Sequence, residues 1–351
     1  MPVDNFAPEE IPVILIYNID PGWKKEEKEE AITISEKMGK ALRDVGHPTE
    51  YVSIEDEKIA DKLFAYSPDD WIIFNWCESI PGISHSEWMV ASKLEALGFT
   101  FTGADAKALL LSQDKHRIKN MLQEAGIPTP EWILLERPET VDWEKYPAIV
   151  KPVYEHCSEG IDAGSVVLSA AEAQARIAKI REQYRQPVLL EDFIDGREFR
   201  VAILGNDFLE VLPVAEMEFS HFKSAKERLC GYEAKFVPGS EHYEKIETLL
   251  PAPLSADELN KLSDICKKAY RTTECRDYAR LDVRYRDGVF YVLDVNPNAD
   301  LSFDASMACA AESAGISYGE MGSRIVRMAL SRHRAATGIA GKQGGISGIT
   351  S

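Results

Sequence analysis

The sequence predicts an α/β fold that begins with a doubly wound parallel sheet and continues in α+β units. Apolar runs of strand length alternate with helical patterns over roughly the first 100 residues, which is the order of a parallel sheet covered by helices. Apolar and polar residues alternate on both sides of a Gly-containing turn in residues 280–296, which predicts an antiparallel hairpin. A chain of 351 residues also has room for two or three domains.

The composition is that of a globular protein, with 45% hydrophobic and 28% charged residues. A formal net charge of −18 argues against a nucleic-acid partner, because affinity for a phosphate backbone comes from clustered Lys and Arg. The six cysteines form no Cys-x-x-Cys pair, which favours a reducing compartment. No apolar run is long enough to span a bilayer, and the acidic start differs from a signal peptide. We therefore expect a cytoplasmic protein with no membrane partner.

The first domain is expected to alternate strands with helices. Residues 11–16 are an apolar run that ends in the turn 18–22, and the charged amphipathic stretch 24–45 predicts a helix that Gly46 terminates. The charge run at the start of this helix is expected to be a solvated face. Further strands are predicted at 51–54 and 71–76, and a further helix at 87–97.

Two lysines lie in segments that favour anion binding. Lys115 is near the start of a helix predicted for residues 112–125, where free backbone N–H groups favour an anion. Lys151 lies near the end of a buried strand, 148–152, and a polar loop with glycine, 155–160, follows it. A strand, a lysine and such a loop can cover phosphates. A lysine that snorkels beside an ordinary loop explains the same residues.

The middle and end of the chain predict further short α+β elements. The polar stretch 222–244 has little periodicity, and loops of that length tend to be functional or disordered. Capping boxes predict helices after Ser169 and Ser255. We also expect strands at 188–191 and 198–204 with a hinge at 191–194 between them, helices at 307–314 and 318–333, and a Gly/Ser-rich tail at 338–351.

The hairpin 280–296 is the most informative stretch. For its apolar residues to share one face, Tyr285 should pair with Val289 across a three-residue loop. In that register Arg280 lies opposite Asp294, and the other face collects polar residues, namely Arg280, Asp282, Arg284, Asp294 and Asn296. Carboxylate and amide oxygens suit magnesium, which keeps its remaining positions for phosphates and water. A surface ladder of ion pairs is the alternative interpretation.

Taken together, the motifs of this chain resemble the ATP-grasp superfamily and, within it, the D-alanine–D-alanine ligase family, from about residue 74 to 330. The motifs, in chain order, are Lys115, Val150-Lys151-Pro152, the segment 191–198, Tyr232-Glu-Ala-Lys235, Arg280-Leu-Asp282 and Asp294-Val-Asn296. The resemblance implies a three-domain ATP-grasp architecture. Its expected parts are an N-terminal α/β domain at 1–107, a central subdomain at 108–194, a C-terminal subdomain with the metal site at 195–335, and a flexible tail at 336–351.

The resemblance also implies a role for each motif residue. Lys115 and Lys151 would contact the nucleotide phosphates, and Glu198 would take the ribose hydroxyls. The hinge with Glu191, Phe193 and Ile194 would bind the adenine. Lys235, on a mobile loop, would reach the terminal phosphate. The implied catalytic residues are Arg280, Lys235 and Ser158, and the implied metal ligands are Asp282, Asp294 and Asn296.

The chain departs from the family pattern around the substrates. The turn 18–22 offers no glutamate for the first substrate's amino group, and His156 and Cys157 interrupt the phosphate-covering loop between Glu155 and Ser158. Where the family has a glycine and a serine beyond the metal-binding asparagine, this chain has Asp300 and Asp304. These charges would repel a carboxylate, so we expect an acceptor that is positive or neutral there. The alternative is that both aspartates face solvent or cap a helix that begins near Ser306.

The resemblance implies an ATP-dependent ligase that joins an amino acid or similar small carboxylate to an amine through an acyl-phosphate. The expected cofactors are ATP and Mg²⁺, with Mn²⁺ as an alternative metal, and a homodimer is left open. A genuine D-alanine–D-alanine ligase is the second interpretation. The third, from another class, is a non-catalytic nucleotide-binding regulator.

Overall fold

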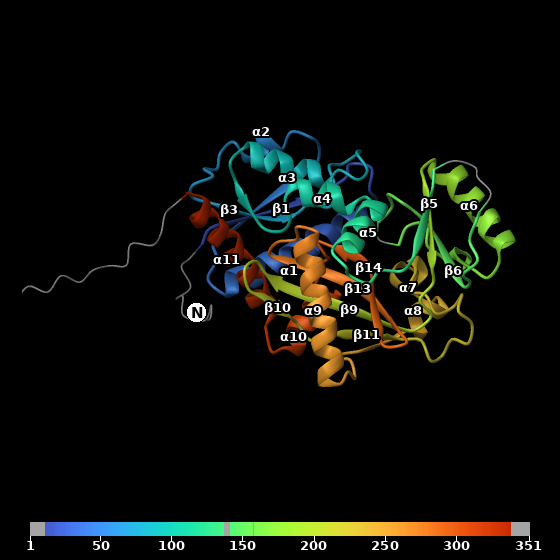
Figure 1. Cartoon of the computed structure of the whole chain (residues 1–351). Helices are drawn as coiled ribbons and strands as arrows, with labels where there is room; N and C mark the ends of the chain where they lie inside the picture. The colour runs from blue at the N-terminus through green and yellow to red at the C-terminus, as the bar shows by residue number, and fades with distance from the viewer. Residues whose placement is uncertain (1–10, 137–140, 157, 338–351) are drawn as a thin grey trace, which may run out of the picture.

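A computed structural model describes residues 11–136, 141–156 and 158–337, with the backbone alone at 235–236 and 333–337. Three β-sheets organise this part of the chain (Figure 1). The first sheet contains β1 to β4. The second and third sheets lie beside each other in Figure 1, with the second forming a separate lobe.

The first sheet is parallel, with the strand order β2-β1-β3-β4. Alternate residues of β1 face opposite sides: Val13 and Leu15 join the core under α1 and α11, whereas Ile14 and Ile16 join the core under α2 and α3. A sheet covered on both faces is the predicted doubly wound arrangement. The elements are β1 (Val13–Asn18), α1 (Lys25–Asp44), β2 (Thr49–Ile54), α2 (Ile59–Leu63), β3 (Ile72–Trp76), α3 (Glu87–Ala96), β4 (Thr100–Phe101), α4 (Ala106–Ser112) and α11 (Tyr318–Thr337).

The second sheet is antiparallel, with the order β5-β8-β6-β7, and α6 covers one face of it. The N-cap of α6 is as predicted, because the Ser169 hydroxyl accepts the N–H of Glu172. The elements are α5 (Lys115–Glu124), β5 (Trp132–Leu135), β6 (Ala148–Pro152), β7 (Val166–Val167), α6 (Ala170–Tyr184) and β8 (Val188–Asp192).

The third sheet is also antiparallel, with the order β12-β11-β9-β13-β14, and β10 pairs with β9. Helices α5 and α9 bury one face, and the predicted capping box of Ser255 and Glu258 starts α9. The elements are β9 (Arg197–Gly205), β10 (Leu209–Val211), β11 (Ala215–Glu218), α7 (Tyr232–Phe236), α8 (Glu241–Lys245), β12 (Glu247–Leu249), α9 (Ala256–Thr272), β13 (Tyr278–Arg286), β14 (Val289–Asn296) and α10 (Ser306–Ser313).

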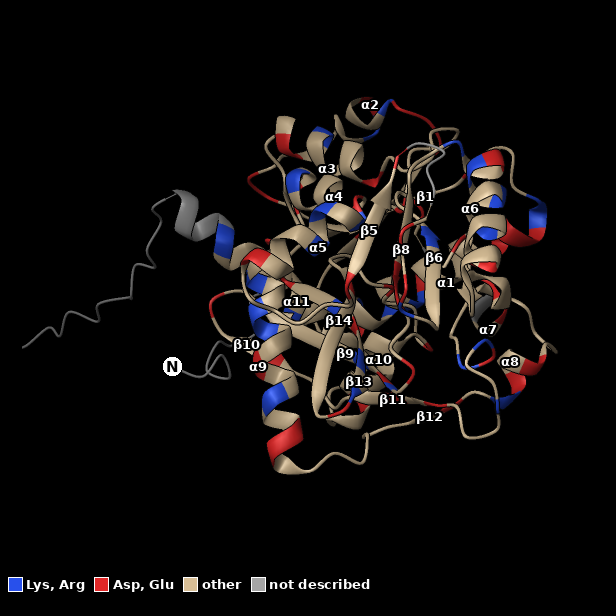
Figure 2. Ribbon diagram, turned by 45° about the vertical axis from the view of Figure 1, so that its right-hand side comes forward, with Lys and Arg blue, Asp and Glu red and all other residues tan. Residues whose placement is uncertain are grey.

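Two features of the surface bear on function. Acidic and basic residues are interspersed on α6 and α9 (Figure 2), so these helices present no single-sign face. Within the described residues, no helix is long and apolar enough to cross a bilayer.

The proposed domain boundary at 107/108 falls within α4, and the domain boundaries remain a proposal.

Candidate active site

The β13–β14 hairpin turns over two residues, Asp287 and Gly288. Arg286 pairs with Val289, and the φ angles of the turn residues are 52° and 84°. Positive φ at both central positions is what a tight hairpin turn requires, because its twist then matches that of the strands. The predicted three-residue loop, with Tyr285 opposite Val289, was therefore wrong.

A β-bulge in β14 compensates for the short turn, which would otherwise place the apolar residues of the two strands on opposite faces. Val283 pairs with Val292, but Asp282 pairs with Asp294, so Leu293 is an extra residue on β14. Consequently, the buried residues of β14 are Phe290 and Val292 on one side of the bulge and Val295 on the other. The polar residues do share one face, but Asp294 faces Asp282 and not, as predicted, Arg280.

The polar face of the hairpin is held together by Arg280. Its Nε lies 2.8 Å from Asp282 Oδ1 and its Nη2 lies 3.0 Å from Oδ2, which is a bidentate ion pair. Asn296, opposite Arg280, donates from Nδ2 to the Arg280 carbonyl at 3.2 Å. Burial lowers the pKa of Arg280, but Asp282 outweighs it and the net shift is upward. Arg280 is thus a fixed cation beside two carboxylates.

Asp282, Asp294 and Asn296 fit the chemistry of a magnesium site. They offer two carboxylates and one amide from the adjacent strands β13 and β14. No group of three or more His, Cys, Asp or Glu side chains that could hold a metal occurs in the described part of the chain. A hard cation held by two carboxylates would take further oxygens from phosphates and water.

Lys151 lies in a buried cluster of three charges. Its Nζ donates to Glu191 Oε1, and the Nζ of Lys119 lies 2.6 Å from Glu191 Oε2. The Glu191 and Lys119 side chains are 1% and 3% exposed. Burial raises the pKa of Glu191, but the two lysines outweigh burial and lower it. The cluster therefore keeps a net positive charge in the interior, next to the second sheet.

Sequence reasoning missed Lys119. It follows Lys115 by four residues on α5, so both lysines lie on one face of that helix. That spacing was the available signal. Burial lowers the pKa of Lys119, and Glu191 opposes this shift.

Lys115 connects the central lobe with the hairpin. It is the first residue of α5, and its Nζ donates to the carbonyl of Glu155 in the loop after β6. Burial lowers the pKa of Lys115, and Asp294 on β14 is the largest influence that raises it. The structure thus brings the predicted phosphate lysine and the predicted metal ligand within electrostatic range of each other.

The predicted hinge connects the second and third sheets. Phe193 and Ile194 are 3% and 1% exposed, and the backbone N–H of Phe193 donates to Pro147. Arg286 on β13 forms an ion pair with Asp192, at 2.5 Å between Nη2 and Oδ2. The segment that would meet the adenine is therefore anchored from both lobes.

Glu198 pairs with Arg284, a polar residue of the hairpin that the sequence left without a role and that is buried in the structure. Arg284 Nε and Nη2 lie 2.8 and 2.7 Å from Glu198 Oε2. Arg284 also donates to the Ile194 carbonyl and lies over the Phe193 ring, with 4.5 Å between Cζ and the centroid. The structure thus connects the predicted ribose ligand to the hinge through one arginine.

The loop 155–160 lies over the same region, but it is described only in part. Ser158 has a φ of 64°, and Cys157 lies outside the described residues. His156 is half-buried; desolvation and then Lys115 lower its pKa to about 4, and no group of the described residues hydrogen-bonds its Nε2. Helix α7 contacts the loop through the N–H of Tyr232, which donates to Ile161. The Lys235 side chain lies outside the described residues.

The two aspartates after the hairpin differ in position. Asp300 Oδ1 accepts the N–H of Ser302 at 2.8 Å, and Asp300 lines a small pocket. Asp304 is exposed. Helix α10 begins at Ser306 with Ala305 as its N-cap and without a side-chain cap, so the helix-cap alternative was wrong.

These groups converge from separate elements on one region between the second and third sheets. Lys115 comes from α5, Lys151 from β6, and Arg280 with the two aspartates from the hairpin. Fixed cations beside carboxylates that can hold a metal are the arrangement that phosphoryl transfer needs, because the reaction depends on positioning and on charge compensation.

Comparison with known proteins agrees with this geometry. The family model described as D-ala D-ala ligase C-terminus matches residues 121–327, which is more than half of the chain. The D-alanine–D-alanine ligase of Chromohalobacter salexigens is 32% identical over 75% of this chain and 78% of its own length. The uncharacterized protein y4sG of Sinorhizobium fredii is 32% identical over 86% of this chain and 88% of its own.

A solved structure supports the fold. The crystal structure of D-alanine–D-alanine ligase from Bacillus anthracis complexed with ATP has a TM-score of 0.71 and covers 93% of this chain and 99% of that chain. At 20% sequence identity this likeness concerns the fold.

Proposed function

The chain belongs to the D-alanine–D-alanine ligase family of ATP-grasp enzymes, and from this membership we propose that it joins an amino acid or similar small carboxylate to an amine through an acyl-phosphate. Membership makes it an ATP-dependent ligase that forms an amide bond, which sets aside the non-catalytic regulator. The polar face of the hairpin, where Arg280 pairs with Asp282 and Asp294 acts electrostatically on Lys115, is the observation that supports the chemistry.

The proposed reaction has two steps. A carboxylate oxygen attacks the γ-phosphorus of ATP, the bond from that phosphorus to the β-phosphate oxygen breaks, and ADP leaves. The amine nitrogen then attacks the acyl carbon, the bond to the phosphate oxygen breaks, and inorganic phosphate leaves as the nitrogen loses a proton. Water must be excluded between the steps, because it would hydrolyse the acyl-phosphate.

Each charged residue near the hairpin has a role in this proposal. Lys115 and Lys151 bind phosphate oxygens, and Arg280 stabilises the charge of the transferred phosphoryl group. Lys235, on α7, reaches the terminal phosphate when its segment closes, and Ser158 donates from the covering loop. Asp282, Asp294 and Asn296 would hold Mg²⁺, which supplies further positive charge to the phosphates.

The hinge provides a place for the nucleoside. Glu191, Phe193 and Ile194 border the adenine in this proposal. Both contacts from Arg284 go to Oε2 of Glu198, which leaves Oε1 for a ribose hydroxyl. His156, which is neutral at pH 7, adds an uncharged imidazole beside the phosphates.

D-alanine–D-alanine ligase activity is the second candidate. Its support is that relatives over most of this chain carry that name, including the Chromohalobacter salexigens protein. The departures at residues 18–22 and at Asp300 concern the groups that would meet the two alanines, so we place this activity behind the broader carboxylate–amine ligase.

An ADP-release screen tests the proposal. Purified protein with ATP and Mg²⁺ is incubated with amino acids singly and in pairs, and products are identified by mass. We expect ADP release that requires a carboxylate and an amine together, with a product lighter than their sum by one water. ADP release without any condensed product would reject the ligase assignment.

A further inference from the structure

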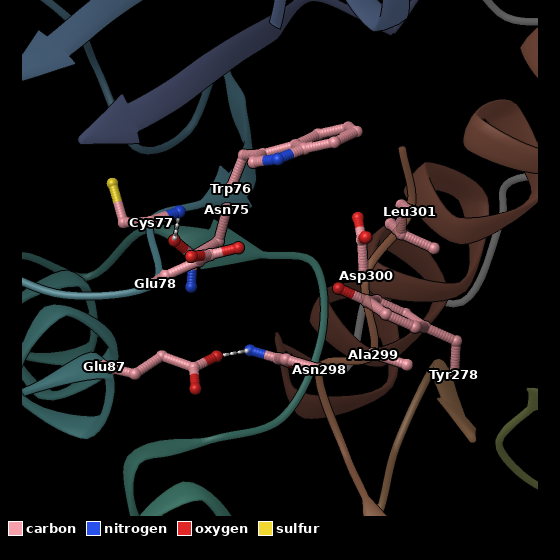
Figure 3. A pocket seen from close by; sticks show the side chains of 10 residues that line it. All are labelled: Asn75, Trp76, Cys77, Glu78, Glu87, Tyr278, Asn298, Ala299, Asp300 and Leu301. Atoms are coloured by element: carbon pink, nitrogen blue, oxygen red, sulfur yellow. Dashed lines mark hydrogen bonds between the residues drawn. The ribbon is translucent and has the colours of Figure 1, made fainter. Parts of the chain in front are cut away.

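A small pocket lies between the first sheet and the loop that follows β14 (Figure 3). It is bounded by the end of β3, the start of α3 and the segment after Asn296. Figure 3 shows the Tyr278 ring between Asp300 and Asn298, with its hydroxyl directed across the pocket. The lining residues are Asn75, Trp76, Cys77, Glu78, Glu87, Tyr278, Asn298, Ala299, Asp300 and Leu301.

Asn75 leaves a buried donor unsatisfied in this pocket. Its side chain is 4% exposed, and its Oδ1 accepts the backbone N–H of Cys77 at 3.2 Å. This contact fixes the orientation of the amide, because an N–H needs an acceptor. The Nδ2 group then has no hydrogen-bond partner among the described residues. An unsatisfied buried donor is unfavourable, so this amide favours a ligand with an acceptor atom.

The rest of the pocket is acidic. Glu78 and Asp300 lie on opposite walls (Figure 3), and none of the ten lining residues is Lys or Arg. Both side chains are exposed at the rim of the pocket, and partial desolvation of Glu78, followed by the charge of Asp300, raises the pKa of Glu78. Glu87 is already bonded, since its Oε1 accepts from Asn298 Nδ2 at 2.6 Å. Two carboxylates that repel each other across a pocket would be stabilised by a cation between them.

We propose that this pocket binds an amino group of the substrate that takes no part in the reaction. The ammonium lies between Glu78 and Asp300, and a neighbouring neutral oxygen of the same substrate accepts a hydrogen bond from Asn75 Nδ2. The proposal rests on the ligase function above, and it names the class of that ligase's substrate. A ligand with a free carboxylate at this position is disfavoured, because it would face Glu78 and Asp300 at short range.

The turn after β1 does not contribute to the lining of this pocket. Asp20 is the acidic residue of that turn, and its oxygens already accept two backbone N–H groups, from Gly22 at 2.7 Å and from Gly82 at 3.1 Å. Asp20 therefore stabilises the turn and its contact with the loop after β3. The carboxylates that face the pocket come instead from the segment after β3 and from the segment after β14.

Three small probes of similar shape separate the two contacts. Alaninamide has an amine, mostly protonated at pH 7 because α-amino groups titrate at about 8, and an amide oxygen. Isobutyramide replaces the amine with methyl, and isopropylamine replaces the amide with methyl. Their affinities for the full-length protein are measured by ligand-observed NMR titration. We expect alaninamide to bind more tightly than either analogue, and more tightly than alanine with its free carboxylate.

Variants assign each preference to a residue. Glu78→Gln should reduce the preference for alaninamide over isobutyramide about tenfold, because a charged contact is lost. Asn75→Asp keeps the acceptor for Cys77 and removes the donor, so the preference over isopropylamine should fall about threefold to tenfold. The added charge acts equally on both amines and cancels in this ratio. Glu57→Gln, an exposed change in the loop after β2, is the matched control and should leave both ratios unchanged.

The outcomes distinguish this proposal from the proposed function. The amine site would be overturned if the wild-type protein bound alaninamide and isobutyramide equally. It would also be overturned if the affinity ratios were unchanged in variants that unfold at the wild-type temperature. In either case the ligase could still release ADP. Failure of the ADP-release screen would reject the ligase and leave the probe affinities standing. The expected result is loss of the amine preference in Glu78→Gln together with full ATP binding.

Discussion

The nucleotide region and the acidic pocket differ in the sign of their charges and in how those charges are partnered. In the nucleotide region every charge of the Lys119–Glu191–Lys151 cluster has a partner within the protein. In the pocket, the Asn75 Nδ2 group has no hydrogen-bond partner among the described residues, and Glu78 faces the like charge of Asp300. The nucleotide region is cationic and its charges are paired within the protein, which suits phosphates. The acidic pocket is anionic and lacks an acceptor for Asn75 Nδ2 among the described residues, which suits a cationic molecule that also carries a hydrogen-bond acceptor.

This difference separates what the family resemblance explains from what it does not. The cationic region contains the residue types that the ATP-grasp motifs imply, at Lys115, Lys151 and Arg280. The pocket includes Asp300, one of the positions where the chain departs from those motifs, together with Glu78 in the segment after β3. We infer that ATP use follows the family, whereas the choice of substrate follows this chain's own pocket.

The largest effect is expected from Asp294→Asn, because it removes a charged ligand from the proposed metal site while keeping the shape of the side chain. ATP turnover should fall roughly 100-fold or more. The matched control is Asp287→Asn in the exposed hairpin turn, where Asn tolerates the positive φ. If folded Asp294→Asn protein turned over ATP at the rate of the Asp287→Asn protein, the proposed role of Asp294 as a metal ligand would be rejected.

Lys151→Ala should weaken ATP binding at least about tenfold, because one charged phosphate contact is lost. Isothermal titration calorimetry with ATP and Mg²⁺ measures the change. Lys107→Ala is the control, since Lys107 is 72% exposed and pairs with Glu274 on the surface. Unchanged affinity in Lys151→Ala would mean that Lys151 serves only to neutralise Glu191.

Sequence reasoning predicted the local features of both regions. Helices with capping residues at Ser169 and Ser255 were predicted because a cap and its helix lie within a few residues of each other. The hairpin strands were predicted, but their register was not, because the bulge at Leu293 depends on which face the core covers. The pairing of Arg284 with Glu198, and the pocket of Asn75, Glu78 and Asp300, join segments far apart in the chain. Periodicity carries no information on such contacts.

A smaller effect is expected from Asp300→Gly. It should raise the catalytic efficiency with acceptors that carry a free carboxylate, relative to their amidated analogues, by several-fold, since one repulsive charge is removed. Stability should fall little, because only the contact to the Ser302 N–H is lost. An unchanged ratio in a folded variant would mean that Asp300 takes no part in selecting the acceptor.

The last effect is on the stability of the substrate-free protein rather than on its activity. Burial is the main cause that raises the pKa of Glu87 to about 8 from 4.5. Between these values the folded protein holds a proton that the unfolded chain has released, so stability falls as pH rises through this range. Glu87→Gln keeps an acceptor for Asn298 and removes the titration. It should raise the free energy of unfolding at pH 8 by roughly 4 kcal/mol, seen as a higher unfolding temperature, and have no effect near pH 4. A shift that is independent of pH would contradict the assignment.

The fate of an isotopic label tests the proposed chemistry most directly. The carboxylate substrate found in the ADP-release screen is prepared with ¹⁸O in its carboxylate oxygens, and the released phosphate is analysed by mass spectrometry after a single turnover. An acyl-phosphate transfers one carboxylate oxygen to the phosphate, so we expect one ¹⁸O in each phosphate released. Unlabelled phosphate together with an amide product, or label in AMP, would contradict activation of the carboxylate by the γ-phosphoryl group.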